Sequence, residues 1–323
     1  MLEALKFVMR GVARKDYVPG LTHFRIQNGR CTGYNGTFCI SAPVDISFDV
    51  APQAGMFIKA LNACEEVITL KMESPTSLLV RSGSFRVSVP CIPPESVPQV
   101  TPSGVMLAPH ASILHAFSAL APFIGVDASR KWALGILLAG ESAYATNNVV
   151  ITEYWLGSAF PALVNIPSGI VDEVIHIDEE LSAMQVSDSS ITFHYKDGRW
   201  IHSPVLALSW PDVPSLMRKC WQDANLTDVT EAFQAACLKI TPFTDPDFGH
   251  IYFRGFDIST TKGGISDGGA VFEMPGLPIK GCFHTKHLNK VLEAAEEADF
   301  TKYPDAVPFR GGNLRGIMLG IHS

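Results

Sequence analysis

The sequence predicts an α+β protein in which one unit, two helices packed on an antiparallel sheet, occurs three times. A glycine followed by a strand of alternating apolar residues recurs at Gly83, Gly198 and Gly312, which are 115 and 114 residues apart. An amphipathic helix precedes each of these segments, and another stands further upstream each time. A period of this length is that of a domain and not of a solenoid. We therefore expect three similar domains.

The first helix of each repeat is predicted from apolar residues at helical spacing. These helices are expected within residues 2–13, 111–125 and 228–240. In the first of them, Leu5, Met9 and Val12 would face the core.

Strands and a second helix complete each repeat. Strand candidates separated by turn residues fill residues 23–44, 132–156 and 249–274. The second helices are expected within residues 54–66, 167–178 and 284–298, and the glycine-strand segments follow them.

Joints rich in proline or polar residues are expected at Val97–Val105 and Trp210–Asp223. The predicted domains are residues 1–104, 105–220 and 221–323.

Composition limits the function classes. With 47% hydrophobic and 18% charged residues, the chain is expected to be globular and not disordered. Its seven cysteines are scattered without a C-x-x-C pair, so neither a disulfide framework nor a zinc site is indicated, and a reducing cytoplasm is expected. No signal peptide, membrane span or cofactor is expected. The net charge of −7 argues against a generally basic nucleic-acid binder, although a basic stripe can lie on an acidic surface.

Enzyme motifs are missing from the sequence. It contains no G-x-S-x-G, no H-E-x-x-H and no phosphate-binding G-x-x-x-x-G-K-[ST]. The glycine-rich stretch Thr260–Gly269 is interpreted as a hairpin loop, and His284 and His287 as surface or helix-end residues without a metal. We expect no catalytic activity.

Three stretches resemble the bacterial DNA polymerase III beta-subunit sliding clamp family. Residues 57–100 look like the second half of the first clamp domain, with its strand-turn-strand and its proline-containing linker. "YATNNVVITEYW", residues 144–155, stands where the family has Ala-Thr-Asp-Gly-His-Arg. Residues 197–217 stand where it has a strand pair that ends in Phe-Pro-Asp-Tyr. The resemblance runs essentially from end to end. The chain is shorter than bacterial examples, and we interpret it as a phage-encoded or otherwise divergent clamp.

The resemblance implies a DNA sliding clamp: a processivity factor without catalytic activity of its own, which encircles duplex DNA without reading its sequence. Two copies would join head to tail into a homodimeric ring of six domains, with helices lining the hole. The replicative polymerase, a clamp loader and other clients would bind through short peptide motifs, in the cytoplasm of a bacterium or a phage-infected host. The alternative is a clamp-fold binding or assembly protein that does not encircle DNA.

Basic residues on the predicted helices are candidate phosphate contacts. Lys6, Arg10 and Arg14 follow one another at i, i+4 and i+8 and would form one stripe. The second repeat lacks such a stripe, and the resemblance implies contacts at "ASRKWALG" there. The predicted DNA-binding residues are Lys6, Arg10, Arg14, Lys59, Arg130, Lys131, Trp132, Lys286 and Lys290. A solvated helix face, and a core position for Trp132, are the alternatives.

The resemblance also implies an apolar client-peptide pocket between the second and third domains. Its predicted residues are Ala133, Thr146, Asn147, Asn148, Val149, Val150, Ile151, Pro211, Leu216, Ile317 and Leu319, with the C-terminal "GIMLGIHS" as one wall. Val149 and Val150 stand where the family usually has His-Arg, so we expect a different client motif or a reduced groove. Asn147 and Asn148 are also ordinary turn residues, and Ile317 and Leu319 are also consistent with strand core.

Overall fold

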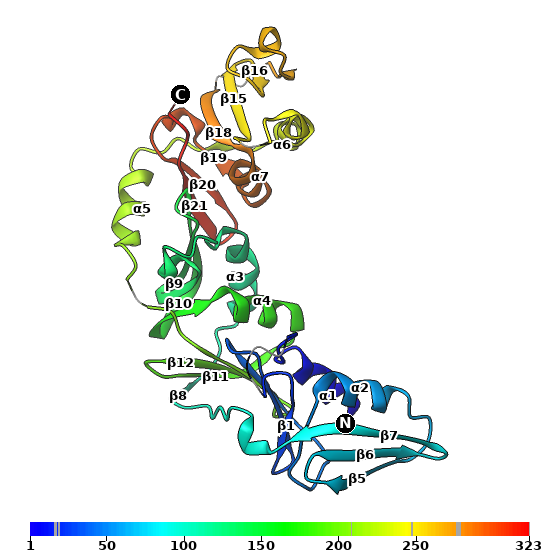
Figure 1. Ribbon diagram of the computed structural model, residues 1–323. Helices are drawn as coiled ribbons and strands as arrows, with labels where there is room; N and C mark the ends of the chain where they lie inside the picture. The colour runs from blue at the N-terminus through cyan, green and yellow to red at the C-terminus, as the bar shows by residue number, and fades with distance from the viewer. Residues whose placement is uncertain (16–17, 19, 208, 247, 276–278, 323) are drawn as a thin grey trace. The chain divides into compact units, whose positions relative to one another are not determined.

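The computed structural model describes residues 1–15, 18, 20–207, 209–246, 248–275 and 279–322, and it divides into two compact units (Figure 1). Unit 1 is Met1–Pro109 with His176–Val205, and unit 2 is His110–Ile175 with Leu206–Ser323. The middle predicted domain, residues 105–220, therefore contributes to both units.

The helices agree with the sequence prediction except in two places. They are α1 (Leu2–Met9), α2 (Ala54–Asn62), α3 (Ile113–Leu120), α4 (Ser168–Ile177), α5 (Val213–Trp221), α6 (Glu231–Ile240) and α7 (Thr285–Ala294). Short 3-10 turns are η1 (Pro94–Ser96), η2 (Ala121–Phe123), η3 (Lys131–Ala133), η4 (Thr241–Phe243), η5 (Gly264–Asp267) and η6 (Phe300–Lys302). Helix α5 lies in the segment expected to be a joint, and α1 is shorter than expected.

Helix α1 ends at Met9 and not near residue 13. A Cβ atom on Gly11 would lie 2.8 Å from the carbonyl oxygen of Gly33 and 2.9 Å from Cβ of Ile40. The chain therefore turns where its backbone passes closely over the sheet, which only a residue without a side chain permits. As a correction, Arg10 caps the helix and Arg14 lies beyond it, so the expected helical stripe is interrupted.

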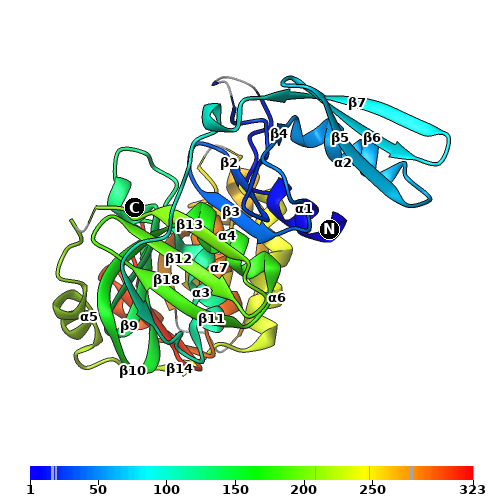
Figure 2. The same ribbon diagram turned by 90° about the horizontal axis from the view of Figure 1, so that it is seen from below.

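Unit 1 contains a seven-stranded antiparallel sheet that joins the first and second repeats. Its strand order is β1 (Arg25–Gln27), β2 (Arg30–Tyr34), β3 (Cys39–Pro43), β13 (Trp200–Pro204), β12 (Ser190–Tyr195), β11 (Leu181–Val186) and β8 (Val105–Leu107). The junction pairs β3 with β13, Ile40 opposite Ile201. A second sheet in this unit has the order β4 (Ala51–Pro52), β7 (Phe85–Ile92), β6 (Ser77–Ser82) and β5 (Ile68–Ser74). Helix α2 runs beside it (Figure 2).

Unit 2 repeats this arrangement with the second and third repeats. Its six-stranded sheet has the order β14 (Thr227–Asp228), β19 (Glu297–Ala298), β20 (Val307–Gly311), β21 (Leu314–Met318), β10 (Val150–Pro167) and β9 (Gly135–Thr146). The junction pairs β10 with β21, Ile151 opposite Ile317. The other sheet has the order β17 (Val271–Glu273), β16 (Asp257–Ser259), β15 (His250–Gly255) and β18 (Ile279–His284). The hairpin predicted at Thr260–Gly269 joins β16 to β17 and is confirmed.

The three recurring glycines occupy equivalent turns, as the repeat predicts. Gly83 lies between β6 and β7, Gly198 between β12 and β13, and Gly312 between β20 and β21. Their φ angles are +53°, +82° and +53°. Positive φ strains any residue with a side chain, which explains why glycine stands at all three turns.

Each unit has its own apolar core. Phe24, Phe57 and Phe193 are fully buried in unit 1, and Phe117, Phe123 and Phe283 in unit 2. In unit 2, α3 packs on β9 and β10, whereas α7 packs on β20 and β21. Helix α5 contacts the same two strands β20 and β21 from the other side of the sheet (Figure 1).

Candidate functional site

The six-stranded sheet of unit 2 has two faces with different cover. We call the face that α5 contacts the outer face and the face that α7 contacts the helical face (Figure 1). Because directly paired residues of an antiparallel sheet share a face, the register sorts the predicted residues into rows.

An apolar cluster lies between α5 and the outer face. Its buried members are Leu137, Tyr144, Val213, Met217 and Ile317. Val213 and Met217 are four residues apart on α5 and so lie on one side of the helix. The side chain of Asp212 starts this helix by accepting a hydrogen bond from the backbone N–H of Ser215 at 3.1 Å.

The structure divides the predicted client residues by exposure. Ala133, Thr146, Val150 and Ile317 are buried, at 1%, 2%, 0% and 4% exposure. Asn147, Asn148, Val149 and Ile151 are half-buried, whereas Pro211, Leu216 and Leu319 are exposed. The C-terminal segment, residues 316–323, was expected to form one wall of the client pocket. Its last residue, Ser323, lies outside the described residues.

Helix α5 places Met217, and not the predicted Leu216, against the sheet. Met217 is 1% exposed and Leu216 is 38% exposed. Once the segment is known to be helical, its i, i+4 spacing from Val213 identifies Met217 as the residue that faces the sheet. The chain's own helix therefore covers the apolar part of the outer face.

Asn147 fixes the turn between β9 and β10. Its side-chain oxygen accepts hydrogen bonds from the backbone N–H groups of Val149 and Val150, at 3.1 and 2.8 Å. Its amide nitrogen lies 3.1 Å from Nδ1 of His287 on α7, and it donates to that nitrogen. Asn148 adopts a φ of +72°, as asparagine tolerates in turns. The turn residues are thus held to the helical face.

The predicted DNA-binding residues of unit 1 lie on or near α1 and α2, which pack against each other. Lys6 and Lys59 are exposed, and Lys6 forms an i, i+3 ion pair with Glu3 at 2.8 Å. Arg10 is half-buried at the end of α1, and Arg14 is exposed beyond it. Exposed ion pairs of this kind are weak, so Lys6 can exchange its partner for a phosphate at little cost.

In unit 2 the predicted DNA-binding residues separate. Lys286 is exposed on α7, whereas Lys290 donates a hydrogen bond to the carbonyl oxygen of Pro122 and ties α7 to η2. Burial and the charge of Lys286 lower the pKa of Lys290. Arg130 and Lys131 are exposed at η3.

Trp132 is half-buried and packs edge-to-face on Trp210, with ring centroids 5.2 Å apart. Trp210 itself packs against the apolar cluster. The structure therefore brings Trp132 together with the apolar cluster under α5.

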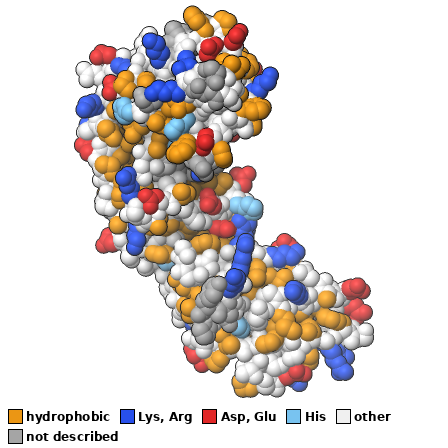
Figure 3. All heavy atoms as spheres, turned by 45° about the horizontal axis from the view of Figure 1, so that its top comes forward, with side chains coloured by type: hydrophobic (Ala, Val, Ile, Leu, Met, Phe, Trp, Pro, Cys, Tyr) orange, Lys and Arg blue, Asp and Glu red, His pale blue; other side chains and the backbone are white. Residues whose placement is uncertain are grey.

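Charge is dispersed on the surface that Figure 3 draws, where Lys and Arg side chains alternate with Asp and Glu. No large basic patch is visible on that face among the described residues.

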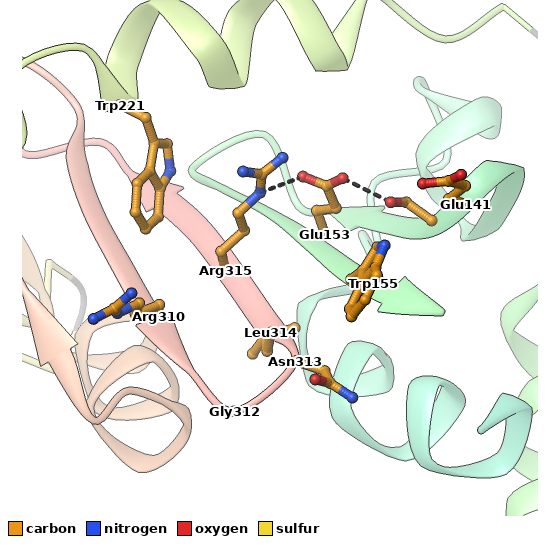
Figure 4. A pocket seen from close by; sticks show the side chains of 10 residues that line it. Glu141, Glu153, Trp155, Trp221, Arg310, Gly312, Asn313, Leu314 and Arg315 are labelled. Atoms are coloured by element: carbon orange, nitrogen blue, oxygen red, sulfur yellow. Dashed lines mark hydrogen bonds and ion pairs between the residues drawn. The ribbon is translucent and has the colours of Figure 1, made fainter. Parts of the chain in front are cut away.

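Beside the apolar cluster, the outer face contains a polar recess of about 510 Å³. We call it the Glu153 recess (Figure 4). It is lined by Glu141, Ser142, Glu153, Trp155, Trp221, Arg310, Gly312, Asn313, Leu314 and Arg315. None of these residues was predicted from the sequence, because they come from strands, from turns and, for Trp221, from the end of α5, and only the fold brings them together.

The Glu153 carboxylate is buried, and both of its oxygens accept hydrogen bonds. It accepts from Ser142 Oγ at 2.7 Å and from the Tyr144 hydroxyl at 3.3 Å, and it pairs with Arg315 Nε at 2.6 Å. Burial and the neighbouring Glu153 carboxylate raise the pKa of Tyr144. The pair fixes the guanidinium of Arg315 at the surface of the recess.

The described residues hold no group of three or more His, Cys, Asp and Glu side chains arranged to bind a metal ion. None of the helices described is both long and apolar enough to cross a bilayer. His284 caps the start of α7, where its ring nitrogen accepts a hydrogen bond from the N–H of Lys286.

Comparisons with known proteins identify the fold. No family model matches the sequence, and the search of curated proteins finds no match. The DNA polymerase III subunit beta from Pseudomonas aeruginosa has a similar structure, with 14% identity and a TM-score of 0.83. The sliding clamps of Bacillus subtilis (15%, TM-score 0.82) and Caulobacter crescentus (16%, TM-score 0.82) are also similar. Each match covers 100% of this chain and 97% of the other. The chain therefore has the α+β sliding-clamp fold, as its resemblance predicted.

His287 predicts a pH-dependent stability. Burial, followed by the charges of His284, Lys286 and Lys290, lowers its pKa from 6.5 to about 4. The unfolded chain therefore binds a proton between these values that the folded chain excludes, and the free energy of unfolding falls as pH drops through this window. His287→Gln keeps an acceptor for Asn147 and should reduce the loss between pH 6.5 and 4.5 by about 1 kcal/mol, since His287 is half-buried.

Urea unfolding at several pH values measures this difference. At pH 7.5 the two proteins should have nearly the same free energy of unfolding, and parallel curves down to pH 4.5 would contradict the prediction.

Proposed function

We propose that this chain is a DNA sliding clamp, a homodimer that closes around duplex DNA and tethers a replicative polymerase and other clients. The observation that carries the proposal is the sliding-clamp fold over the whole chain, at a TM-score of 0.83. The clamp would supply enclosure and weak phosphate contacts and no catalytic step. It would act in the cytoplasm of a bacterium or of a phage-infected host.

The sheet edges support a head-to-tail ring. Each junction inside the chain pairs a strand from the first half of one repeat with the last strand of the next repeat, β3 with β13 and β10 with β21. The equivalent strands that remain are β17 in the third repeat and β7 in the first. Strand β17 pairs with β16 alone, and residues 85–90 of β7 pair with β6 alone, among the described strands. If the β7 strand of a second copy paired with β17 of the first, the contact between copies would repeat the strand pairing of the two junctions inside the chain. In a closed ring this pairing would cover the unpaired edges of both strands.

Three domains per chain, residues 1–104, 105–220 and 221–323, would give six in the ring. The order of elements supports this division, because a helix, strands, a second helix and a last strand group recur three times. Helices α1, α2, α3, α4, α6 and α7 would line the hole.

The exposed lysines and arginines on these helices and at η3 would contact phosphates without reading bases. Polymerase and loader peptides would bind the outer face near α5, which exposes Leu216.

The alternative, a clamp-fold assembly protein that does not encircle DNA, differs in its predicted oligomeric state. A ring requires a particle of about twice 35.1 kDa, whereas a monomer at working concentration supports the alternative.

Retention on DNA tests enclosure. The protein, loaded on a nicked circular duplex with a clamp loader or by passive opening, should remain bound in high salt because release requires the ring to open. On the same DNA after linearisation it should slide off within minutes. If linearisation leaves retention unchanged, the proposed enclosure is wrong.

Lysine substitution tests the DNA-contacting face. The triple variant Lys6→Ala, Lys59→Ala and Lys286→Ala should weaken binding to linear duplex and flatten its salt dependence. The slope of log K against log salt should change by about 0.9 for each phosphate that the variant no longer neutralises. The matched control replaces Lys71, Lys196 and Lys280, which are exposed outside the helices. Equal slopes for the two triple variants would contradict this assignment.

An edge variant tests the dimer. Phe85→Asp with Val87→Asp places two charges on β7, where an apolar strand edge would meet its partner, and should weaken dimerisation at least tenfold. Light scattering should then give a mass near 35.1 kDa, and retention on circular DNA should be abolished. Val67→Asp, at a side chain that is 86% exposed in the same repeat, is the control and should stay dimeric. A dimeric edge variant would exclude β7 from the interface.

A further inference from the structure

One row of charged residues crosses the outer face of unit 2. Glu297, Arg310, Arg315, Glu153 and Tyr144 are consecutive partners in register across β19, β20, β21, β10 and β9. Paired residues share a face, so all five side chains emerge on the outer side. The charged part of this row crosses the Glu153 recess (Figure 4).

Two arginines stand directly opposite each other in this row. Arg310 on β20 pairs with Arg315 on β21, and their side chains are 55% and 50% exposed. Directly opposed like charges are unfavourable on adjacent strands. Each arginine is held by its own carboxylate through Nε, Arg310 by Glu297 and Arg315 by Glu153.

The terminal nitrogens of both guanidinium groups remain available to a ligand. No hydrogen bond from these nitrogens is found within the described part of the chain. The Arg315 guanidinium also lies 5.9 Å from the ring of Trp221, which limits its movement. Both arginines line the recess, but they lean to opposite sides, Arg310 toward Glu297 on β19 and Arg315 toward Glu153 on β10 (Figure 4). Each guanidinium fork can therefore bind a separate carboxylate.

The surroundings favour a peptide over a free ion. The recess volume of about 510 Å³ is far larger than a carboxylate group, and the ring of Trp155, 53% exposed, offers apolar area at its rim. The next row of the outer face is Pro308, Ile317 and Ile151, and of these Ile317 and Ile151 belong to the apolar cluster under α5. Rows are two residues, roughly 7 Å, apart. An extended segment can therefore place an acidic side chain in the recess and an apolar one beside α5.

We propose that Arg310 and Arg315 each bind an acidic side chain of an extended partner peptide, with an aromatic or aliphatic neighbour of these side chains against Trp155. This inference deepens the proposed function and rests on it for the nature of the partner. The partner contact then includes a polar row that lies next to the client residues implied by the clamp resemblance. DNA phosphates would reach the helical face instead, where Lys286 lies.

Indole NMR tests the proposal on the full-length protein. The chain has five tryptophans, and ¹⁵N-labelled indoles give one signal each, with Trp155 and Trp221 assigned from their Phe variants. The probe is acetyl-Gly-Phe-Asp-Asp-Leu-Gly-amide, and its matched control carries Asn-Asn in place of Asp-Asp. We expect the acidic peptide to shift the Trp155 and Trp221 signals saturably and to bind at least tenfold more tightly than the amide control.

Arginine variants assign the effect to the recess. Arg310→Gln, at an exposed position, should weaken binding of the acidic peptide about tenfold, and Arg315→Lys should weaken it similarly because a lysine lacks the planar fork. Arg254→Gln on β15 lies outside the recess and should bind as the wild type does. Thermal unfolding of each variant confirms that it is folded. The Arg315→Lys variant weakens the pairing with buried Glu153 and could unfold for that reason. In that case Arg310→Gln alone tests the proposal, because Arg310 does not pair with Glu153.

Three results would overturn the proposal: equal affinity for the Asp and Asn peptides, unchanged affinity in folded Arg310→Gln, or inorganic phosphate that shifts both indoles at the same concentration as the peptide. Retention on nicked circular DNA separates this inference from the proposed function. Arg310→Gln should be retained like the wild type. Loss of retention by the wild type would refute the clamp function without affecting the peptide result.

Discussion

The structure depends on strand pairing between repeats. Each repeat ends a sheet with an open strand, and the backbone N–H and C=O groups of that strand need partners. The junctions satisfy them by joining successive repeats, Ile40 opposite Ile201 and Ile151 opposite Ile317. Because each compact unit contains one junction, the units do not coincide with the three repeats, and the middle repeat is divided between them. Among the described strands, β17 and residues 85–90 of β7 each keep one unpaired edge, which is where the proposed second copy would pair.

The same junction determines what the outer face of unit 2 can bind. Strands β10 and β21 come from different repeats, and their pairing places Glu153 beside Arg315 and Ile151 beside Ile317. Removing Arg315 would leave the Glu153 carboxylate poorly compensated, because Glu153 is only 6% exposed. The charged pair is therefore a structural feature of the junction as well as part of the proposed binding site. Helix α5 covers the apolar row with Val213 and Met217 and leaves the charged row open.

The sequence allowed most of the fold to be predicted, because periodicity and glycine turns are local signals. Six helices and the turns at Gly83, Gly198 and Gly312 follow from spacing and from the demand for positive φ. Helix α5 was missed because the prolines around Asp212 resemble a linker, although Asp212 followed by Pro214 also marks a helix start. Helix α1 was predicted too long because the close approach of Gly11 to Gly33 is a tertiary contact. The Glu153 recess could not be predicted, since its members meet only through strand register.

Asn147 illustrates how the two faces of the unit 2 sheet can influence each other. Its oxygen shapes the turn at Val149 and Val150, and its nitrogen reaches His287 on α7. Burial, followed by the charges of His284, Lys286 and Lys290, lowers the pKa of His287 to about 4, so its Nδ1 is unprotonated at neutral pH and accepts from Asn147. A protonated Nδ1 cannot accept from Asn147, so the hydrogen bond that holds the turn would break. The turn is therefore held to the helical face at neutral pH and is released only in acid, when His287 takes up a proton. Every residue in this link belongs to unit 2.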